Sequence, residues 1–91
     1  MGIIRVAASS RTSAVAGAIA GVYRDQGFVE VQAIGAGALN QAIKAIVIAK
    51  GYLAEEDKAI VFSPSMVEVE IEGALRTAIR LSIENKDGKL L

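Results

Sequence analysis

Two short segments of the sequence gather residue types that bind anions. Hydroxyl, amide, guanidinium and ammonium groups donate hydrogen bonds to an anion, and glycines let backbone N–H groups approach a phosphate closely. Each segment follows a short run rich in β-branched residues, which predicts a turn between a strand and a helix. The chemistry that these segments indicate is the binding of a phosphate or another anion. The candidate site residues are Ser9, Ser10, Arg11, Gly35, Gly37, Asn40, Gln41 and Lys44.

The pair Gly35 and Gly37 also invites comparison with a dinucleotide-binding turn. In that fingerprint a third glycine follows, but this chain has Asn40 at the position. The next predicted strand ends in Phe-Ser-Pro at residues 62–64, without the carboxylate that would hold a ribose, and the chain is too short for a doubly wound fold. We therefore expect no cofactor. An alternative stays open: the glycines only form a tight turn, the hydroxyls cap a helix, and Asn40 and Gln41 are solvated or hold the loop.

Residues for catalysis and metal binding are scarce. The chain has no Cys and no His, which removes thiolate nucleophiles, the usual zinc ligands and the side chain best suited to proton transfer near neutral pH. Glu68, Glu70 and Glu72 fall on one side of a predicted strand, with Arg80 expected on its neighbour. A solvated, salt-bridged surface fits them better than a metal site. We expect no catalytic residues, no metal site and no enzyme.

Hydrophobic periodicity predicts secondary-structure elements in the order βαβαββ. Gly27 and Gly51 are predicted to end the two helices. Pro64 cannot donate to a β-ladder, so its strand is expected to lie at a sheet edge or to break there. The predicted ranges are strand 3–7, helix 13–25, strand 29–33, a helix from 39 or 40 to 50, strand 59–62 with pairing resumed at 66–71, hairpin turn 72–75, and strand 77–84.

This order predicts an α+β, two-layer domain, with a mixed four-stranded sheet and two helices on one face, because crossovers between parallel strands are right-handed. At 91 residues the chain fits one domain over 1–91, with an ordered core over about 3–84 and a tail over 85–91. Both turns should emerge at the same edge of the sheet. The other face should carry polar side chains that face water or form a binding platform: Arg5, Glu30, Gln32, Glu68, Glu70, Arg80 and Ser82.

The charge balance and the hydropathy of the sequence limit the kinds of partner that we expect the protein to bind. Ten basic and ten acidic residues balance, which argues against the strong positive field of a protein that coats DNA. Residues 1–50 carry five basic and two acidic residues, so an anion site belongs in this half. No apolar run is long enough to cross a membrane and no secretion signal is evident, so we expect no membrane partner and a cytoplasmic location.

Several motifs together resemble one protein family. The segments are Val-Ala-Gly-Ala at 15–18, Gln-Ala-Ile-Gly-Ala-Gly-Ala at 32–38, Asn-Gln-Ala at 40–42, Lys-Ala at 44–45 and Ile-Ala-x-Gly at 48–51. They closely resemble the stage V sporulation protein S family, over about residues 3–84 and without an evident gap. That family is similar to the archaeal chromatin protein Alba, which has the same βαβαββ order.

The resemblance implies a homodimer with a nucleic-acid role, either DNA or RNA, and a link to sporulation or to cell development and division. Alba-type proteins carry lysines in the first turn, arginine in the second and a long hairpin arm. Here the turns hold Ser9, Ser10 and Arg11 and the neutral residues 34–38, while Glu70 and Glu72 lie near the hairpin tip. Nucleic-acid binding is therefore expected to be weak and salt-dependent. The alternative is a homo-oligomeric module that binds a protein or a small anionic ligand.

Overall fold

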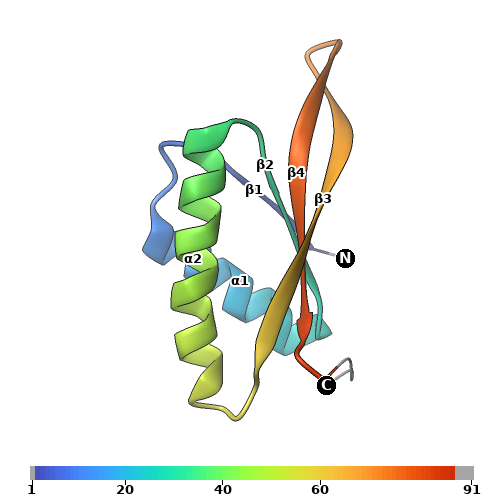
Figure 1. Ribbon diagram of the computed structural model, residues 1–91. Coiled ribbons are helices and arrows are strands. Elements are labelled where there is room, and N and C mark those ends of the chain that lie inside the picture. The colour runs from blue at the N-terminus through green and yellow to red at the C-terminus, as the bar shows by residue number, and fades with distance from the viewer. Residues whose placement is uncertain (1, 88–91) are drawn as a thin grey trace.

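The computed structural model describes residues 2–87 and places a four-stranded sheet against two helices. The helices lie on one face of the sheet (Figure 1). This confirms the predicted βαβαββ order and the α+β, two-layer, Alba-like fold. The elements are β1 (Ile3–Val6), α1 (Thr12–Gln26), β2 (Val29–Ala33), α2 (Ala36–Ala54), β3 (Ile60–Ile71) and β4 (Ala74–Asn85).

The sheet has the strand order β1-β2-β4-β3. β1 and β2 are parallel, and the β2–β4 and β4–β3 pairs are antiparallel, so the sheet is mixed as predicted. β2 is the clearest case of period-two alternation, because Val29, Val31 and Ala33 face the helices and are at most 2% exposed. The sequence pattern of β2 therefore fixes which face of the sheet meets the helices.

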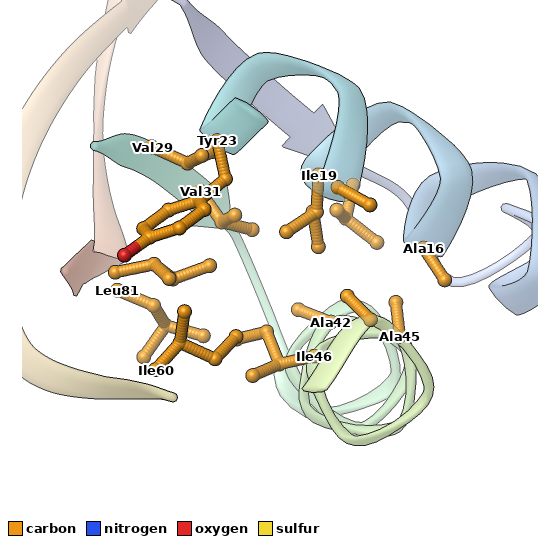
Figure 2. Packing of buried hydrophobic residues seen from close by; sticks show 14 of the residues in the cluster. Ala16, Ile19, Tyr23, Val29, Val31, Ala42, Ala45, Ile46, Ile60 and Leu81 are labelled. Atoms are coloured by element: carbon orange, nitrogen blue, oxygen red, sulfur yellow. The ribbon is translucent and has the colours of Figure 1, made fainter. Parts of the chain in front are cut away.

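Small and branched side chains fill the space between the layers. Ala16 of α1 faces Ala42 and Ala45 of α2, and all three are fully buried (Figure 2). Alanines at this contact let the two helices approach closely, while larger side chains such as Ile19 and Leu81 fill the space beside the sheet. The core is thus made almost entirely from aliphatic residues.

The two helices end differently from each other. Gly27 ends α1 as predicted: it adopts φ 74°, and its N–H donates to the carbonyl of Tyr23 over 2.7 Å. For α2 both predicted ends were wrong, because the helix begins at Ala36 and continues through Gly51 to Ala54. The last turn is held by Leu53, which is 0% exposed. Burial of that side chain outweighs the low helix propensity of Gly51.

β3 lies at the sheet edge and runs unbroken through Pro64, which stands opposite Leu81. The edge position predicted from Pro64 is confirmed, but the predicted break is wrong. A proline at an edge needs no donor toward solvent. Since the strand is continuous, its odd-numbered residues lie on the face of Ser65 and Arg80, which pair directly. The expectation that Glu68 and Glu70 share that face was wrong.

β3 and β4 form a long hairpin closed by Glu72 and Gly73, whose φ angles are 51° and 81°. Two consecutive residues with positive φ make the tight turn whose twist matches the flanking strands. The predicted four-residue turn was too long, because Ala74 and Leu75 belong to β4. β2 pairs only with Ile79–Ile83 of β4. Residues 67–78, called the arm below, therefore extend past β2 and project beyond the helices (Figure 1).

Order extends beyond the predicted core limit of residue 84. Asn85 closes β4, and the N–H of Lys86 donates to the carbonyl of Ala59 over 2.8 Å. The end of the expected tail, residues 88–91, lies outside the described residues. Between residues 2 and 87, no helix is long and apolar enough to cross a membrane.

Candidate functional site

The two turns predicted to bind an anion meet at one edge of the sheet. Parallel pairing of β1 with β2 brings their carboxyl ends together. The Nε2 atom of Gln41 in α2 donates to the backbone carbonyl of Ser10 in the first turn over 2.8 Å. A Cβ atom added at Gly37 would lie 3.0 Å from the Cβ of Ala8. The turns are therefore in direct contact, as expected from parallel neighbouring strands.

The first turn is stabilised by its own backbone and by one hydroxyl. The N–H of Ser10 donates to the carbonyl of Ala7 over 3.0 Å, and the Oγ of Ser10 accepts from the N–H of Ala7 over 2.8 Å. The N-cap of α1 is Arg11, with extended backbone and no side-chain cap. The part of the alternative in which hydroxyls cap a helix was therefore wrong for α1, whereas the part in which Gln41 holds the loop is confirmed by its bond to Ser10. The first helical bond runs from Val15 to Arg11, which leaves the N–H groups of residues 12–14 without a helical acceptor.

The second turn owes its shape to Gly35. This residue is the N-cap of α2 with φ 92° and ψ 159°, a conformation that is essentially restricted to glycine. No side chain caps α2 either, and its first helical bond runs from Leu39 to Gly35. Gly37 lies inside the helix, and its missing side chain makes room for Ala8. Gly35 thus shapes the turn, whereas Gly37 allows the two turns to pack together.

The remaining candidate residues have different surroundings. Gln41 is half-buried by its contact with the first turn, whereas Asn40 and Lys44 are exposed and share the outer face of α2 because they are four residues apart. Ser9 and Arg11 are also exposed. In the described part of the chain, the side chains of Arg11 and Lys44 form no hydrogen bond or ion pair. The structure brings Ser10, Gly37 and Gln41 together and leaves the two cations facing solvent.

A feature that the sequence analysis missed lies on the sheet face away from the helices. Arg5, Gln32, Arg80 and Ser65 stand side by side in one row across the four strands. The Nε of Arg80 donates to the Oγ of Ser65 over 3.1 Å. The sequence pattern placed the first three residues on this face, but their alignment in one row depends on strand order and register, which the pattern does not give.

A cavity of about 190 Å³ adjoins this row, between the ends of β1 and β2 and the arm. Arg5 and Gln32 are its polar lining residues. Its apolar lining comes from the ends of β1 and β2 and from the arm: Val6, Ala7, Ile34, Val69 and Ile71. Ala7 and Ile34 lie at the ends of β1 and β2, just before the two turns, so this cavity is adjacent to the candidate site.

A second surface feature is an apolar groove between α2 and β3. It has a volume of about 320 Å³ and is lined by Ile46, Val47, Lys50 and residues 60–62. Val47 is 64% exposed, and Met66 further along β3 is 76% exposed. α2 thus leaves Val47 exposed, whereas α1 and the sheet cover most of its other apolar residues.

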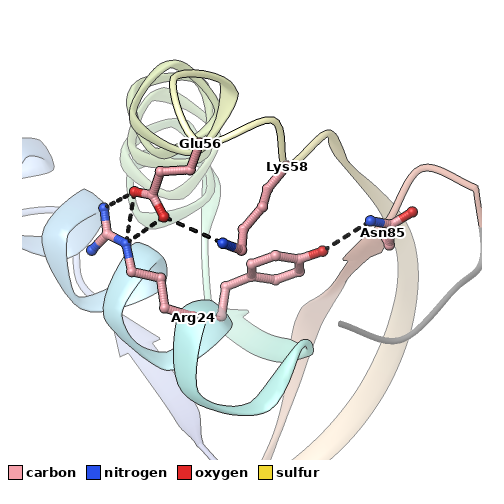
Figure 3. A network of polar contacts seen from close by, with 5 residues as sticks. Arg24, Glu56, Lys58 and Asn85 are labelled. Atoms are coloured by element: carbon pink, nitrogen blue, oxygen red, sulfur yellow. Dashed lines mark hydrogen bonds and ion pairs between the residues drawn. The ribbon is translucent and has the colours of Figure 1, made fainter.

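Ionic contacts between partly exposed side chains lie at the opposite end of the sheet from the turns. Arg24 of α1 and Glu56 after α2 form an ion pair, with 2.7 Å between Nη2 and Oε2, and the Nζ of Lys58 lies 3.4 Å from Oε1 (Figure 3). The hydrogen bond to Glu56 raises the pKa of Arg24, and the hydrogen bond from Arg24 lowers the pKa of Glu56. The pair ties α1 to the segment between α2 and β3. Within residues 2–87 no acidic, His or Cys cluster suited to a metal ion is found.

One comparison with known proteins bears on this geometry. The family model described as stage V sporulation protein S matches residues 2–86. The match includes both helices, all four strands, the two turns and the arm. It therefore covers the complete fold described above and every candidate residue of the turn site.

Proposed function

The chain belongs to the stage V sporulation protein S family, and from this premise we propose that it is a non-enzymatic, cytoplasmic regulatory protein that binds nucleic acid. Family membership links the chain to sporulation. In a cell that does not sporulate, the proposed role extends to cell development or division. The binding surface that we propose is the edge where the two turns meet, and the bound form is a homodimer.

The observation that carries the proposal is the contact between two helix N-termini whose first N–H groups have no side-chain cap. Helix N-termini attract anions through these N–H groups and through their partial positive charge. Arg11 at the N-cap of α1 and Lys44 on α2 add two exposed cations. A nucleic-acid backbone supplies phosphates at regular intervals, which suits a surface with separated donors.

The same observation sets the expected strength of binding. The turn site has few cations, and the arm adds Glu68, Glu70 and Glu72 against Arg76. Each phosphate contact on duplex DNA contributes about 0.9 to the logarithmic salt slope. We therefore expect a shallow salt slope and weak affinity, increased when two copies present their sites together.

Fluorescence anisotropy with duplex DNA, single-stranded DNA and RNA at several salt concentrations tests the proposal. We expect binding at low salt that weakens as salt rises. Arg11→Ala removes a charge-assisted hydrogen-bond donor. Because such a hydrogen bond contributes about 1.5–3 kcal/mol to binding, the variant should bind nucleic acid more than tenfold more weakly. Lys86→Ala removes an exposed cation at the other end of the sheet and is the matched control. Equal affinity of both variants would refute the turn site, and tight binding that ignores salt would contradict the mechanism.

The second copy in the proposed homodimer covers the groove between α2 and β3. Val47 and Met66 project from the two sides of this surface, and the groove between the elements offers space for an apolar side chain. Projections and a recess on one patch are what a two-fold interface needs, since the same surface serves both copies. Analytical ultracentrifugation at micromolar concentration should show a dimer that Val47→Asp dissociates, while Ala18→Asp on the exposed side of α1 leaves it intact. A monomeric wild-type protein would overturn this part of the proposal.

A second candidate function is a module that binds a protein or a small anionic ligand. The zero net charge and the acidic arm favour it. If no nucleic acid binds at low salt while the protein is a dimer, this candidate replaces the first.

A further inference from the structure

The cavity between the ends of β1 and β2 and the arm has the chemical character of a binding site. Most of its lining is aliphatic, and its polar residues are Arg5 and Gln32. Binding pockets for small molecules are typically apolar with a few polar groups that fix orientation. Its volume of about 190 Å³ is below the roughly 300–1,000 Å³ of pockets for whole drug-sized ligands. The cavity therefore suits one compact, flat or branched group that is part of a larger molecule.

The polar residues are available to such a group. Gln32 is half-buried, and one N–H of its amide donates to the Oε2 of Glu30 over 2.8 Å. An amide has a second N–H and a carbonyl oxygen, and these form no other hydrogen bond within the described residues. The bond to Glu30 holds the amide in place. Arg5, on the neighbouring strand in the same row, is exposed and has no ion pair within residues 2–87. A fixed donor–acceptor pair thus lies beside a free guanidinium.

We infer that this cavity binds one unstacked nucleobase of a single-stranded nucleic acid whose phosphates lie along the two turns. The inference rests on the proposed function and names its substrate class. Pockets for extruded bases combine apolar side chains against the base with hydrogen bonds to its edge. Aliphatic residues of the arm and of the strand ends supply the apolar contacts, and Gln32 supplies the hydrogen bonds to the edge of the base. Arg5 supplies a guanidinium that stacks on a base or pairs with its phosphate.

The position of the cavity supports this occupant. Ala7 and Ile34 line it and directly precede the two turns, so a chain bound along the turns passes the cavity entrance. The arm supplies Val69 and Ile71, which gives the arm a contact that does not require positive charge. A base in a duplex is stacked and paired, and its extrusion costs a few kcal/mol. Single strands are therefore the preferred substrate.

The side chain of Val69 offers a direct test. Val69→Phe places an aromatic ring in the cavity, and Leu75→Phe puts the same ring on the other face of the arm, where Leu75 is 68% exposed. The probes are a single-stranded oligothymidylate of eight nucleotides and the same strand with abasic sites, which has the same phosphates and no bases. Anisotropy titrations give the affinity ratio of the two strands, and circular dichroism verifies that both variants are folded.

We expect wild-type protein and Leu75→Phe to bind the strand with bases about tenfold more tightly than the abasic strand. Val69→Phe should reduce this ratio to near one without changing the affinity for the abasic strand. If folded Val69→Phe keeps the wild-type ratio, the cavity does not hold a base, while the proposed phosphate contacts at the turns stand.

A second measurement covers the case in which no oligonucleotide binds or Val69→Phe is unfolded. Methyl resonances of Ile34, Val69 and Ile71 in the wild-type protein are followed by NMR during titration with thymidine monophosphate, inorganic phosphate and isovalerate. Shifts with the mononucleotide alone support the base pocket even if the proposed polymer binding fails. No shift with the mononucleotide overturns the inference. Equal shifts with isovalerate overturn it in favour of a site for small organic acids.

Discussion

The two ends of the sheet differ in how completely their polar groups are used within the chain. At the end where β4 stops, Asn85 donates to the hydroxyl of the buried Tyr23 over 3.4 Å, and Arg24 is paired with Glu56 (Figure 3). At the end where the turns meet, two helix N-termini lack side-chain caps and Arg11 is exposed. The first end joins the layers, whereas the second has helix N–H donors that no side chain caps.

The same contrast separates the body of the sheet from the arm. Val29, Val31 and Ile83 are 0% exposed where the helices cover the sheet, whereas Leu75 and Ile71 on the arm are 68% and 37% exposed. Apolar side chains that a chain leaves exposed contribute little to its own folding. The body of the hairpin therefore supports the fold, whereas the arm leaves apolar side chains exposed.

The largest expected effect concerns two leucines of β4, one in the body of the sheet and one on the arm. Leu81→Ala should destabilise the protein by about 2–5 kcal/mol, because the side chain is 1% exposed and its removal leaves a cavity. Leu75→Ala, on the arm, should change the free energy of unfolding by no more than about 0.5 kcal/mol. Urea denaturation followed by circular dichroism measures both. Similar losses in the two variants would show that the arm is part of the cooperative core.

The next effect concerns the alanines of α1. Ala16 is 0% exposed against α2, whereas Ala18, two residues later, is exposed. Ala16→Leu should destabilise by about 1–3 kcal/mol, because the added atoms force the two helices apart. Ala18→Leu should be nearly neutral. If thermal unfolding shows that Ala16→Leu is tolerated, the helix contact is looser than the structure indicates.

Two glycines sharpen the comparison at the turn end. Gly35 has φ 92° and ψ 159°, so Gly35→Ala should cost about 1–3 kcal/mol in backbone strain. Gly17 lies inside α1 with nothing within 4 Å of an added Cβ, so Gly17→Ala should stabilise by roughly 0.5–1 kcal/mol. Denaturant titrations of the two variants should therefore move in opposite directions. A stabilising Gly35→Ala would mean that the second turn adopts another conformation in solution.

Local patterns in the sequence were enough to predict the elements of the body. The alternation in β2 and the stop at Gly27 depend on residues that are close together in the chain, and both were predicted correctly. The convergence of the turns followed from the parallel pairing of two neighbouring strands, whose carboxyl ends lie at the same edge of a sheet. The shape of the second turn was only partly predictable, because the role of Gly37 depends on its distance from Ala8, which is far away in sequence.

The arm and its cavity needed information that no local pattern holds. Pro64 suggested a break, yet pairing with β4 continues through it, and this continuity decides which side chains of the arm share a face with Arg80. The cavity joins Arg5 and Gln32 to Val69 and Ile71, more than thirty residues later. The register and the twist of the strands bring these residues together, and a local sequence pattern contains neither.

The smallest expected effect is electrostatic. It concerns the ion pair between Arg24 and Glu56, at the end of the sheet away from the turns. The hydrogen bond from Arg24 lowers the pKa of Glu56 in the folded protein, with a smaller contribution from Lys58. The unfolded state therefore binds the proton more readily, and the ion pair stabilises the fold fully at pH values above the ordinary carboxyl pKa. This contribution is lost as the pH falls through the lowered pKa of Glu56. Arg24 stays charged throughout, since its pKa is raised.

Glu56→Gln should consequently reduce stability near neutral pH and flatten its decline in acid, whereas Glu55→Gln, an exposed neighbour, should leave the profile unchanged. Both side chains of the pair are partly exposed, so the difference should be small and should shrink at high salt. Urea unfolding at a series of pH values, with and without added salt, measures it. If the profiles of wild type and Glu56→Gln coincide at low salt, the ion pair does not help to hold α1 against the segment between α2 and β3. The join at that end then depends on the buried Tyr23 and its contact with Asn85.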